Sequence, residues 1–233
     1  MRIISYIVAV LVWLCFIGGV LWGCLESVAF DANYYAGEYE RLDREAVTGM
    51  TAEGLQQTTQ ALFDYIRGDR QNLNIQADIG GVRREVFNDT EKAHMADVQR
   101  LYRLGSTLRY VLWASGAVLL IVLAFISRRR TAKTLSKGYL IALLGAGTAA
   151  GLLGAVIAMD FDRFWQGFHR MFFTNDLWML DPARDVLIQM FPSAFFSGMV
   201  ETILLRFGTL LLVLAVIAVT VLLIKPGRRK EAF

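Results

Sequence analysis

The sequence has few of the residues that form disulfides and covalent active sites. Only two of its 233 residues are cysteines, and only two are histidines. Cys15 and Cys24 lie in one apolar stretch, at a separation that places them on opposite sides of a helix, so they cannot bond to each other. We interpret both as ordinary buried residues, and a disulfide scaffold is excluded.

The usual catalytic motifs are missing as well. The sequence has no Gly-x-Ser-x-Gly elbow, and neither cysteine is placed to act as a nucleophile. A catalytic zinc site needs three protein ligands, but the sequence has no His-Glu-x-x-His motif and no cysteine cluster. We therefore expect no metal ion and no other cofactor. Two histidines with one carboxylate remain as an alternative set of metal ligands.

Charge is scarce too, and four long apolar stretches are left uninterrupted. Charged residues make up 19% of the chain against 55% hydrophobic residues, and the mean hydropathy is +0.44. A helix needs about 20 residues to cross a hydrocarbon layer of about 30 Å, and in lipid every backbone amide must be paired within its own segment. The composition therefore predicts an all-α membrane protein with four transmembrane helices and two extracellular segments that form a small, mainly helical cap. In the third stretch, Gly147 and Gly151 form a small-xxx-small pair that predicts close helix packing. The charge-free stretches are Ile3–Leu25, Tyr110–Ser127, Gly138–Met159 and Phe207–Ile224.

The basic residues predict the direction in which the helices cross the membrane. Lys and Arg in short loops stay on the cytoplasmic side, and they crowd the link after the second stretch and the tail after the fourth. Both termini should therefore be cytoplasmic, and the net charge of +3 is a topology signal that does not indicate nucleic-acid binding. We expect the first stretch to be retained as a signal anchor, because it is longer than the core of a cleaved signal peptide. The predicted organisation is transmembrane helices at residues 1–27, 108–127, 138–159 and 201–224, extracellular segments at 28–107 and 160–200, a basic cytoplasmic loop at 128–137 and a cytoplasmic tail at 225–233.

The first extracellular segment has a helical pattern. Thr51 is a predicted helix cap with Gly54 at the third helical position, and apolar residues at helical spacing follow it. Gly80-Gly81 breaks the chain. A second helix begins near Asp89, and we expect it to continue into the second span.

The second extracellular segment is rich in aromatic residues. Asp181-Pro182 predicts the cap and first position of a helix, which should end near Met190 because Pro192 restricts the residue before it. The aromatic side chains before this helix share one helical face, which is typical of a helix lying in the membrane interface. They also suit a purely structural aromatic belt. The aromatic face consists of Phe161, Phe164, Trp165, Phe168 and Phe172.

Each extracellular segment contains one histidine near a span. Glu91 and Asp97 lie one helical turn on either side of His94, so either carboxylate could orient its ring. His169 follows the aromatic stretch, where an apolar setting disfavours the charged imidazole. A neutral imidazole is what a general base requires. Each histidine taken alone also suits a structural or surface role, and it is their pairing that points to a shared site.

Several motifs accompany the two histidines. They are Phe30-x-x-Asn33-Tyr34-Tyr35, His94-Met95-x-Asp97-Val98, His169-x-Met171-Phe172-Phe173-x-Asn175-Asp176-x-Trp178-x-Leu180-Asp181-Pro182, Asp185-x-Leu187-Ile188, Phe191-Pro192 and Phe195-Phe196. Together these motifs resemble the lipoprotein intramolecular transacylase family, Lit. The resemblance extends over nearly the whole chain, and the block that begins at His169 is its most specific part. The middle of the first extracellular segment, residues 50–85, adds little.

The resemblance implies a reaction and a location. Members of the family lie in the plasma membrane of Gram-positive bacteria and act on lipoproteins whose N-terminal cysteine carries a thioether-linked diacylglyceryl group. They move the sn-2 acyl chain onto the α-amino group of that cysteine, which gives a lyso-form lipoprotein. The implied partners are the diacylated lipoprotein N-terminus as substrate and the membrane lipids, with no nucleic acid.

Two histidines can serve this reaction without a serine or cysteine nucleophile. The amine attacks an ester of its own molecule, so the enzyme must accept one proton, return one and stabilise an oxyanion. We expect His169 to be the base and His94, raised toward its charged form by Glu91 or Asp97, to stabilise the oxyanion or protonate the leaving oxygen; the reverse assignment stays open. A non-enzymatic membrane sensor or assembly partner and a lipid or lipoprotein esterase are the alternatives. The predicted substrate contacts are Asn33, Tyr34, Tyr35, Asp97, Asn175, Asp176 and Trp178.

Overall fold

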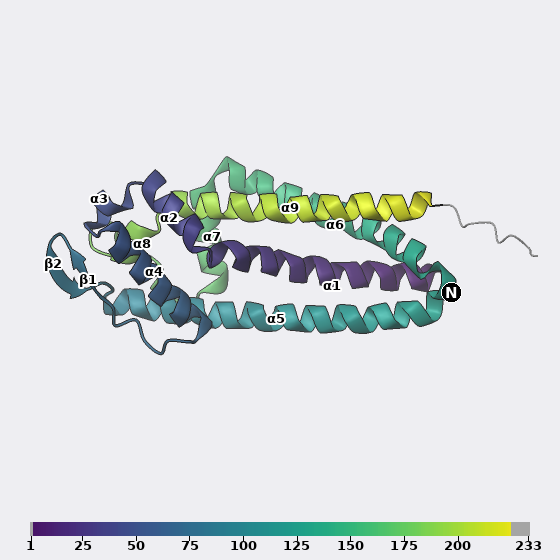
Figure 1. The fold of residues 1–233 in the computed structure, drawn as a ribbon, viewed down its shortest axis with the longest axis horizontal. Helices are drawn as coiled ribbons and strands as arrows, with labels where there is room; N and C mark the ends of the chain where they lie inside the picture. Colours follow the sequence, from purple (N-terminus) through teal and green to yellow (C-terminus); the bar gives the residue numbers. More distant parts are fainter. Residues whose placement is uncertain (1, 225–233) are drawn as a thin grey trace, which may run out of the picture. The chain divides into compact units, whose positions relative to one another are not determined.

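The structure, a computed structural model, describes residues 2–224 and is mainly helical in that range (Figure 1). The predicted basic tail at residues 225–233 lies outside the described residues. In chain order the elements are α1 (Arg2–Ala29), α2 (Ala32–Arg41), α3 (Arg44–Thr48), α4 (Ala52–Arg67), β1 (Gln76–Ile79), β2 (Val82–Glu85), α5 (Asp89–Ser127), the 3-10 helix η1 (Arg128–Arg130), α6 (Thr131–Met159), α7 (Phe161–Phe172), α8 (Val186–Met190) and α9 (Ser193–Leu223).

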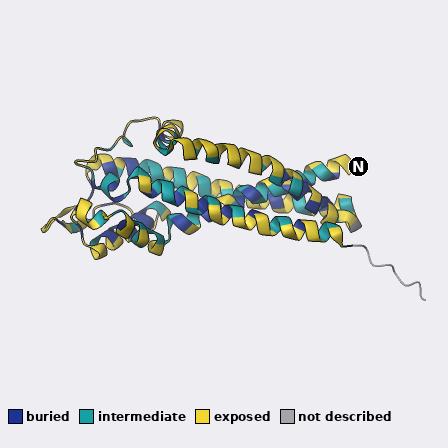
Figure 2. Cartoon of the chain, turned by 90° about the horizontal axis from the view of Figure 1, so that it is seen from above, coloured by how far each residue is buried: buried dark blue, intermediate teal, exposed yellow. Residues whose placement is uncertain are grey.

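The first of two compact units contains the apolar parts of α1, α5, α6 and α9. All four helices are long and apolar enough to cross a membrane, as predicted. Only 6% to 22% of the residues in their most apolar windows are buried inside the protein, and Figure 2 shows exposed residues along the long helices. Apolar surface of this extent is stable when it faces lipid. The all-α membrane fold is therefore confirmed. Of the described residues, this unit takes in 2–22, 109–154 and 204–224.

Close helix packing in this unit depends on a glycine near the start of α6. A Cβ atom on Gly138 would lie only 2.5 Å from the Cβ of Ala9 in α1. The next residue, Tyr139, is fully buried and donates its hydroxyl to a backbone carbonyl of α9. The predicted role of Gly147 and Gly151 is wrong, because a Cβ atom on either would have no described neighbour within 4 Å. The spacing alone did not show which side of α6 has a partner.

The second unit contains the predicted extracellular segments. Thr51 caps α4 as predicted, since its hydroxyl accepts the Gly54 N–H at 3.1 Å. Gly80 and Gly81 form the two-residue turn of the antiparallel β1–β2 hairpin, with φ of 62° and 81°. Such positive φ angles favour glycine and match the twist of a hairpin, so the predicted break is a turn. This unit takes in Gly23–Leu108 and Ala155–Ile203.

Two predicted boundaries differ from the structure. Asp181-Pro182 does not start a helix: the Asp181 carboxylate accepts the Ala183 N–H at 2.9 Å and closes a turn instead. α8 begins four residues later at Val186, with Asp185 as its N-cap residue, and ends at Met190 as predicted. The basic link at 128–137 is largely helical, since η1 leads directly into α6.

Candidate active site

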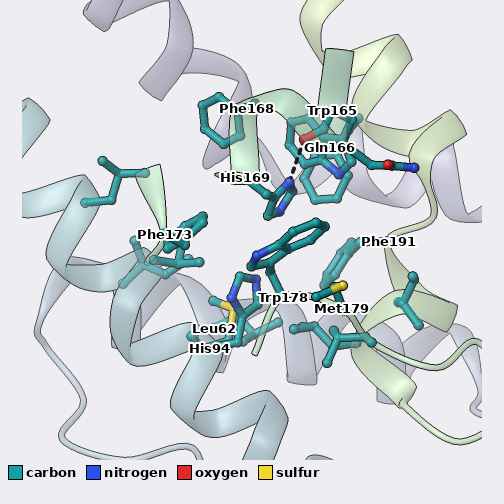
Figure 3. Close-up of a pocket in the computed structure, with 18 of the residues that line it drawn as sticks. Leu62, His94, Trp165, Gln166, Phe168, His169, Phe173, Trp178, Met179 and Phe191 are labelled. Atoms are coloured by element: carbon teal, nitrogen blue, oxygen red, sulfur yellow. Dashed lines mark hydrogen bonds between the residues drawn. The ribbon is translucent and has the colours of Figure 1, made fainter. Parts of the chain in front are cut away.

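The second unit encloses a cavity of about 540 Å³ whose wall is mainly apolar (Figure 3). Helices α4 and α5 supply mainly aliphatic side chains and α7 supplies mainly aromatic ones, while α2, α9 and the chain between α7 and α9 supply the rest. Such a wall suits a hydrocarbon chain. The lining residues are Tyr35, Leu62, Phe63, Ile66, His94, Met95, Val98, Leu101, Asp162, Trp165, Gln166, Phe168, His169, Phe173, Trp178, Met179, Leu180, Leu187, Ile188, Phe191 and Phe196.

Both histidines line this cavity and face each other there. His94 is on the first turns of α5, before its apolar span, and His169 is on the last turn of α7. Their ring centroids are 6.0 Å apart with an angle of 35° between the planes. Both side chains are buried, with 7% and 8% of the residue exposed. The fold therefore brings together two imidazoles that are far apart in the sequence, as Figure 3 shows.

The hydrogen bond of His169 determines which of its nitrogens is basic. Its Nδ1 lies 2.8 Å from the backbone carbonyl oxygen of Trp165, one turn earlier in α7. A carbonyl only accepts, so Nδ1 carries the hydrogen and, in the neutral ring, Nε2 carries the free lone pair. Trp178 stacks on the ring with centroids 4.9 Å apart. Burial lowers the pKa of His169, as expected for an apolar setting, although its hydrogen bond to Trp165 opposes this change.

The predicted charged state of His94 is wrong. Burial and, to a smaller extent, the neighbouring His169 lower its pKa from 6.5 to about 4, while Asp97 acts in the opposite direction. The ring is therefore neutral near pH 7. Its Nδ1 is buried and has no hydrogen-bond partner within residues 2–224. The site thus contains two neutral imidazoles, each of which offers one N–H donor and one basic nitrogen.

Glu91 does not orient His94, contrary to the prediction. Its side chain binds backbone groups instead: Oε2 accepts the Asn88 N–H at 2.7 Å and Oε1 accepts the Leu187 N–H of α8 at 2.6 Å. It does not line the cavity. Burial raises the pKa of Glu91, and these hydrogen bonds partly offset that rise. A helical spacing of three residues was not enough to place the carboxylate beside the imidazole.

The substrate contacts predicted at the exit of the first span divide into two groups. Tyr35 lines the cavity, but its hydroxyl donates to the Ala29 carbonyl at 3.0 Å, so its ring is what faces the cavity. Tyr34 is outside the lining and donates its hydroxyl to the Phe195 carbonyl at 3.3 Å. Asn33 is exposed and also lies outside the lining. Of these three predicted contacts, only Tyr35 lies at the cavity.

Of the substrate contacts predicted near the two histidines, one lines the cavity and three do not. Trp178 lines the cavity and stacks on His169. Asp97 and Asn175 bind each other instead, since the Asn175 side-chain N–H donates to the Asp97 carboxylate at 2.8 Å. Asp176 is exposed and outside the lining.

Sequence reasoning missed most of the cavity wall. In the sequence, Leu62 and Ile66 of α4 and Val98 and Leu101 of α5 are apolar positions of two separate helices. Their periodicity showed that each helix has an apolar face, but it did not show that the two faces share one cavity. Within residues 2–224, no group of three or more His, Cys, Asp or Glu side chains could hold a metal ion.

Comparisons with known proteins identify the family and the fold of the chain. The sequence matches the family of the lipoprotein intramolecular transacylase Lit over residues 8–196. No curated protein matches it significantly. The fold is similar to the in meso structure of the membrane integral lipoprotein intramolecular transacylase Lit from Bacillus cereus, with a TM-score of 0.75, 17% identity, and coverage of 95% of this chain and 97% of that one.

Variants of the same Bacillus cereus protein give similar values. A structure in which one histidine is replaced by alanine has a TM-score of 0.69 at 16% identity and covers 94% of both chains. One with arginine at that histidine has a TM-score of 0.71 at 16% identity, with coverage of 94% of this chain and 92% of that one. At such identities these structures show the shared fold, and the family assignment rests on the sequence match. The chain belongs to the lipoprotein intramolecular transacylase (Lit) family of membrane acyltransferases.

Proposed function

We propose that the chain performs the transacylation of its family in the cavity that contains His94 and His169. The substrate is the N-terminal cysteine of a lipoprotein that carries a diacylglyceryl group. The α-amino nitrogen forms a bond to the carbonyl carbon of the sn-2 ester, and the bond from that carbon to the glycerol oxygen breaks. One proton leaves the nitrogen and one reaches the glycerol oxygen, so the product has the mass of the substrate.

The observation that carries this proposal is the pair of buried, neutral imidazoles, 6.0 Å apart at the cavity wall. A neutral imidazole can accept the proton from the attacking nitrogen. The hydrogen bond of His169 to Trp165 leaves its Nε2 free for that task, which supports His169 as the base. Neutral His94 retains one N–H, which can donate a hydrogen bond to the oxyanion and stabilise it. The protonated His169 then gives its proton to the leaving glycerol oxygen and returns to its neutral form.

The apolar wall supplies the remaining requirements. Because the amine and the ester belong to one molecule, holding them in contact can lower the barrier by about 7–11 kcal/mol. The aromatic and aliphatic lining can hold the acyl chain and exclude water. Water that reached the carbonyl would hydrolyse the ester and release a fatty acid.

The location of the site follows from the predicted topology. Basic residues of the link between α5 and α6 favour the cytoplasm, which puts both termini inside and the second unit at the outer face. We would replace Cys15 and Cys24 by alanine, add either Val82→Cys or Lys133→Cys, and label intact cells with a membrane-impermeant maleimide. The proposal expects labelling at position 82 and none at 133. Labelling at position 133 and none at position 82 would show the opposite topology.

The test of function is a product analysis. The protein is expressed with a diacylated lipoprotein, and the N-terminal lipopeptide is analysed by mass spectrometry. Transfer conserves the mass and moves one acyl chain to nitrogen, whereas hydrolysis removes it. We expect His94→Ala and His169→Ala to abolish transfer. Gln57→Ala, at an exposed position of α4, should leave transfer intact. Transfer that persists in both histidine variants would refute the site.

A further inference from the structure

The chain between α7 and α9, residues 173–192, is tied to α5 by polar contacts on both sides of His94. We call this segment the strap. Before His94, the Leu187 N–H donates to Glu91 at 2.6 Å. After it, the Asn175 side chain donates to Asp97 at 2.8 Å. The strap is therefore fastened one helical turn to either side of the histidine.

The contact at Glu91 is the more extensive of the two. Asn88 and Glu91 form a reciprocal cap of α5: the Asn88 N–H donates to the Glu91 carboxylate at 2.7 Å, and the Glu91 N–H donates to the Asn88 side-chain oxygen at 3.0 Å. The Asn88 side-chain N–H also donates to Asp185, the N-cap residue of α8, at 2.7 Å. Glu91 is only 1% exposed, so water cannot replace these bonds.

The strap carries side chains that touch the histidine pair. Trp178 stacks on His169, and Phe173 packs against both imidazoles, with centroids 5.4 Å from His94 and 5.6 Å from His169. Leu187 extends the cavity wall from the residue whose N–H binds Glu91. A shift of the strap relative to α5 would therefore change the spacing of the two rings and open the cavity wall.

We propose that Glu91 is a positioning residue for the histidine pair, acting through the strap and never touching substrate. This inference rests on the proposed function. A carboxylate suits the position because each of its oxygens accepts a different backbone N–H. Asp97 should contribute less, because Asn175 is exposed and Asp97 also pairs with Arg100 at 3.1 Å.

The test is Glu91→Gln, which keeps the size of the side chain but has a single acceptor oxygen. One of the two backbone N–H groups must then lose its partner. A displacement of about 1 Å at reacting groups can cost about 100-fold in rate, so we expect kcat to fall by about that factor. KM should change little, because the walls that α4 and α7 contribute remain. The fraction of product lost to hydrolysis should rise, because a loosened strap admits water. Asp97→Asn should show the same changes to a smaller extent.

The matched control is Asp89→Asn, a fully exposed acid on the same first turn of α5. It should leave kcat, KM and the hydrolysed fraction unchanged. If Glu91→Gln does not fold, Asn88→Ala is used, which loosens the same contact and should raise the hydrolysed fraction. Normal kcat and product ratio in a folded Glu91 or Asn88 variant would overturn this inference alone. Absence of transfer by the unmodified protein would instead refute the proposed function.

Discussion

Lowering the pH should destabilise the folded protein through His94. The pKa of this buried imidazole is lowered to about 4, whereas the same side chain in an unfolded chain has its ordinary value of 6.5. Between these two values the unfolded state binds a proton that the folded state does not. The stabilising contribution of neutral His94 is therefore fully present above pH 6.5 and is lost as the pH falls toward 4.

The size of the effect follows from the difference between the two pKa values. Each unit corresponds to 1.36 kcal/mol, so the loss amounts to about 3 kcal/mol once the pH has reached the folded-state value. His169 should add to the loss in the same direction, because burial lowers its pKa too. A change of this size is a substantial part of the stability of a typical domain, about 5–15 kcal/mol.

The measurement is reversible unfolding in mild detergent at about pH 7, 5.5 and 4.5, comparing the unmodified protein with His94→Gln. Carboxylates titrate in both proteins, so the difference between the two curves isolates the imidazole. We expect the stability of the unmodified protein to fall more steeply with decreasing pH than that of His94→Gln. Parallel curves would show that His94 is solvated or already charged in the folded protein, and the argument for a neutral pair would fail.

Two further predictions concern packing. Gly138→Val should lower the free energy of unfolding by about 1–3 kcal/mol, because its side chain would overlap Ala9. Gly147→Ala should change this free energy little. Equal melting temperatures of the two variants would contradict the close approach of α1 and α6. Ile66→Trp should shift the preference toward shorter acyl chains by filling part of the cavity, while Ile66→Val should not; an unchanged chain-length profile would place the moving chain elsewhere.

Most structural features that depend on neighbouring residues were predicted correctly from the sequence. The cap at Thr51 and the turn at Gly80-Gly81 each depend on a few adjacent residues, so pattern reasoning located them. The uninterrupted α5 was also predicted, since no helix breaker separates its polar start from its apolar span. Asp181-Pro182 was misleading because the Asp181 carboxylate had a competing local partner, and a turn closed there before a helix could begin.

The distance between the two histidines and the charge on His94 could not be predicted from sequence patterns. The pairing of His94 with His169 was a hypothesis drawn from two separate motifs, and only the tertiary structure shows that the two rings lie 6.0 Å apart. The charge on His94 was predicted wrongly, because burial of the ring lowers its pKa more than the nearby Asp97 carboxylate raises it. Glu91 found its partners in Asn88 and Leu187, and the latter is distant in the sequence.

The sequence by itself determined that four apolar helices cross a membrane, because in lipid a chain has no partner for its backbone amides other than itself. It also determined which residue types were available for chemistry, since two histidines had no competing nucleophile or metal cluster beside them. Only the tertiary structure decided that both imidazoles are neutral, that an apolar cavity lies beside them and that Glu91 holds the strap. Those properties depend on burial and on partners that the chain brings together from distant positions, and neither can be read from local spacing.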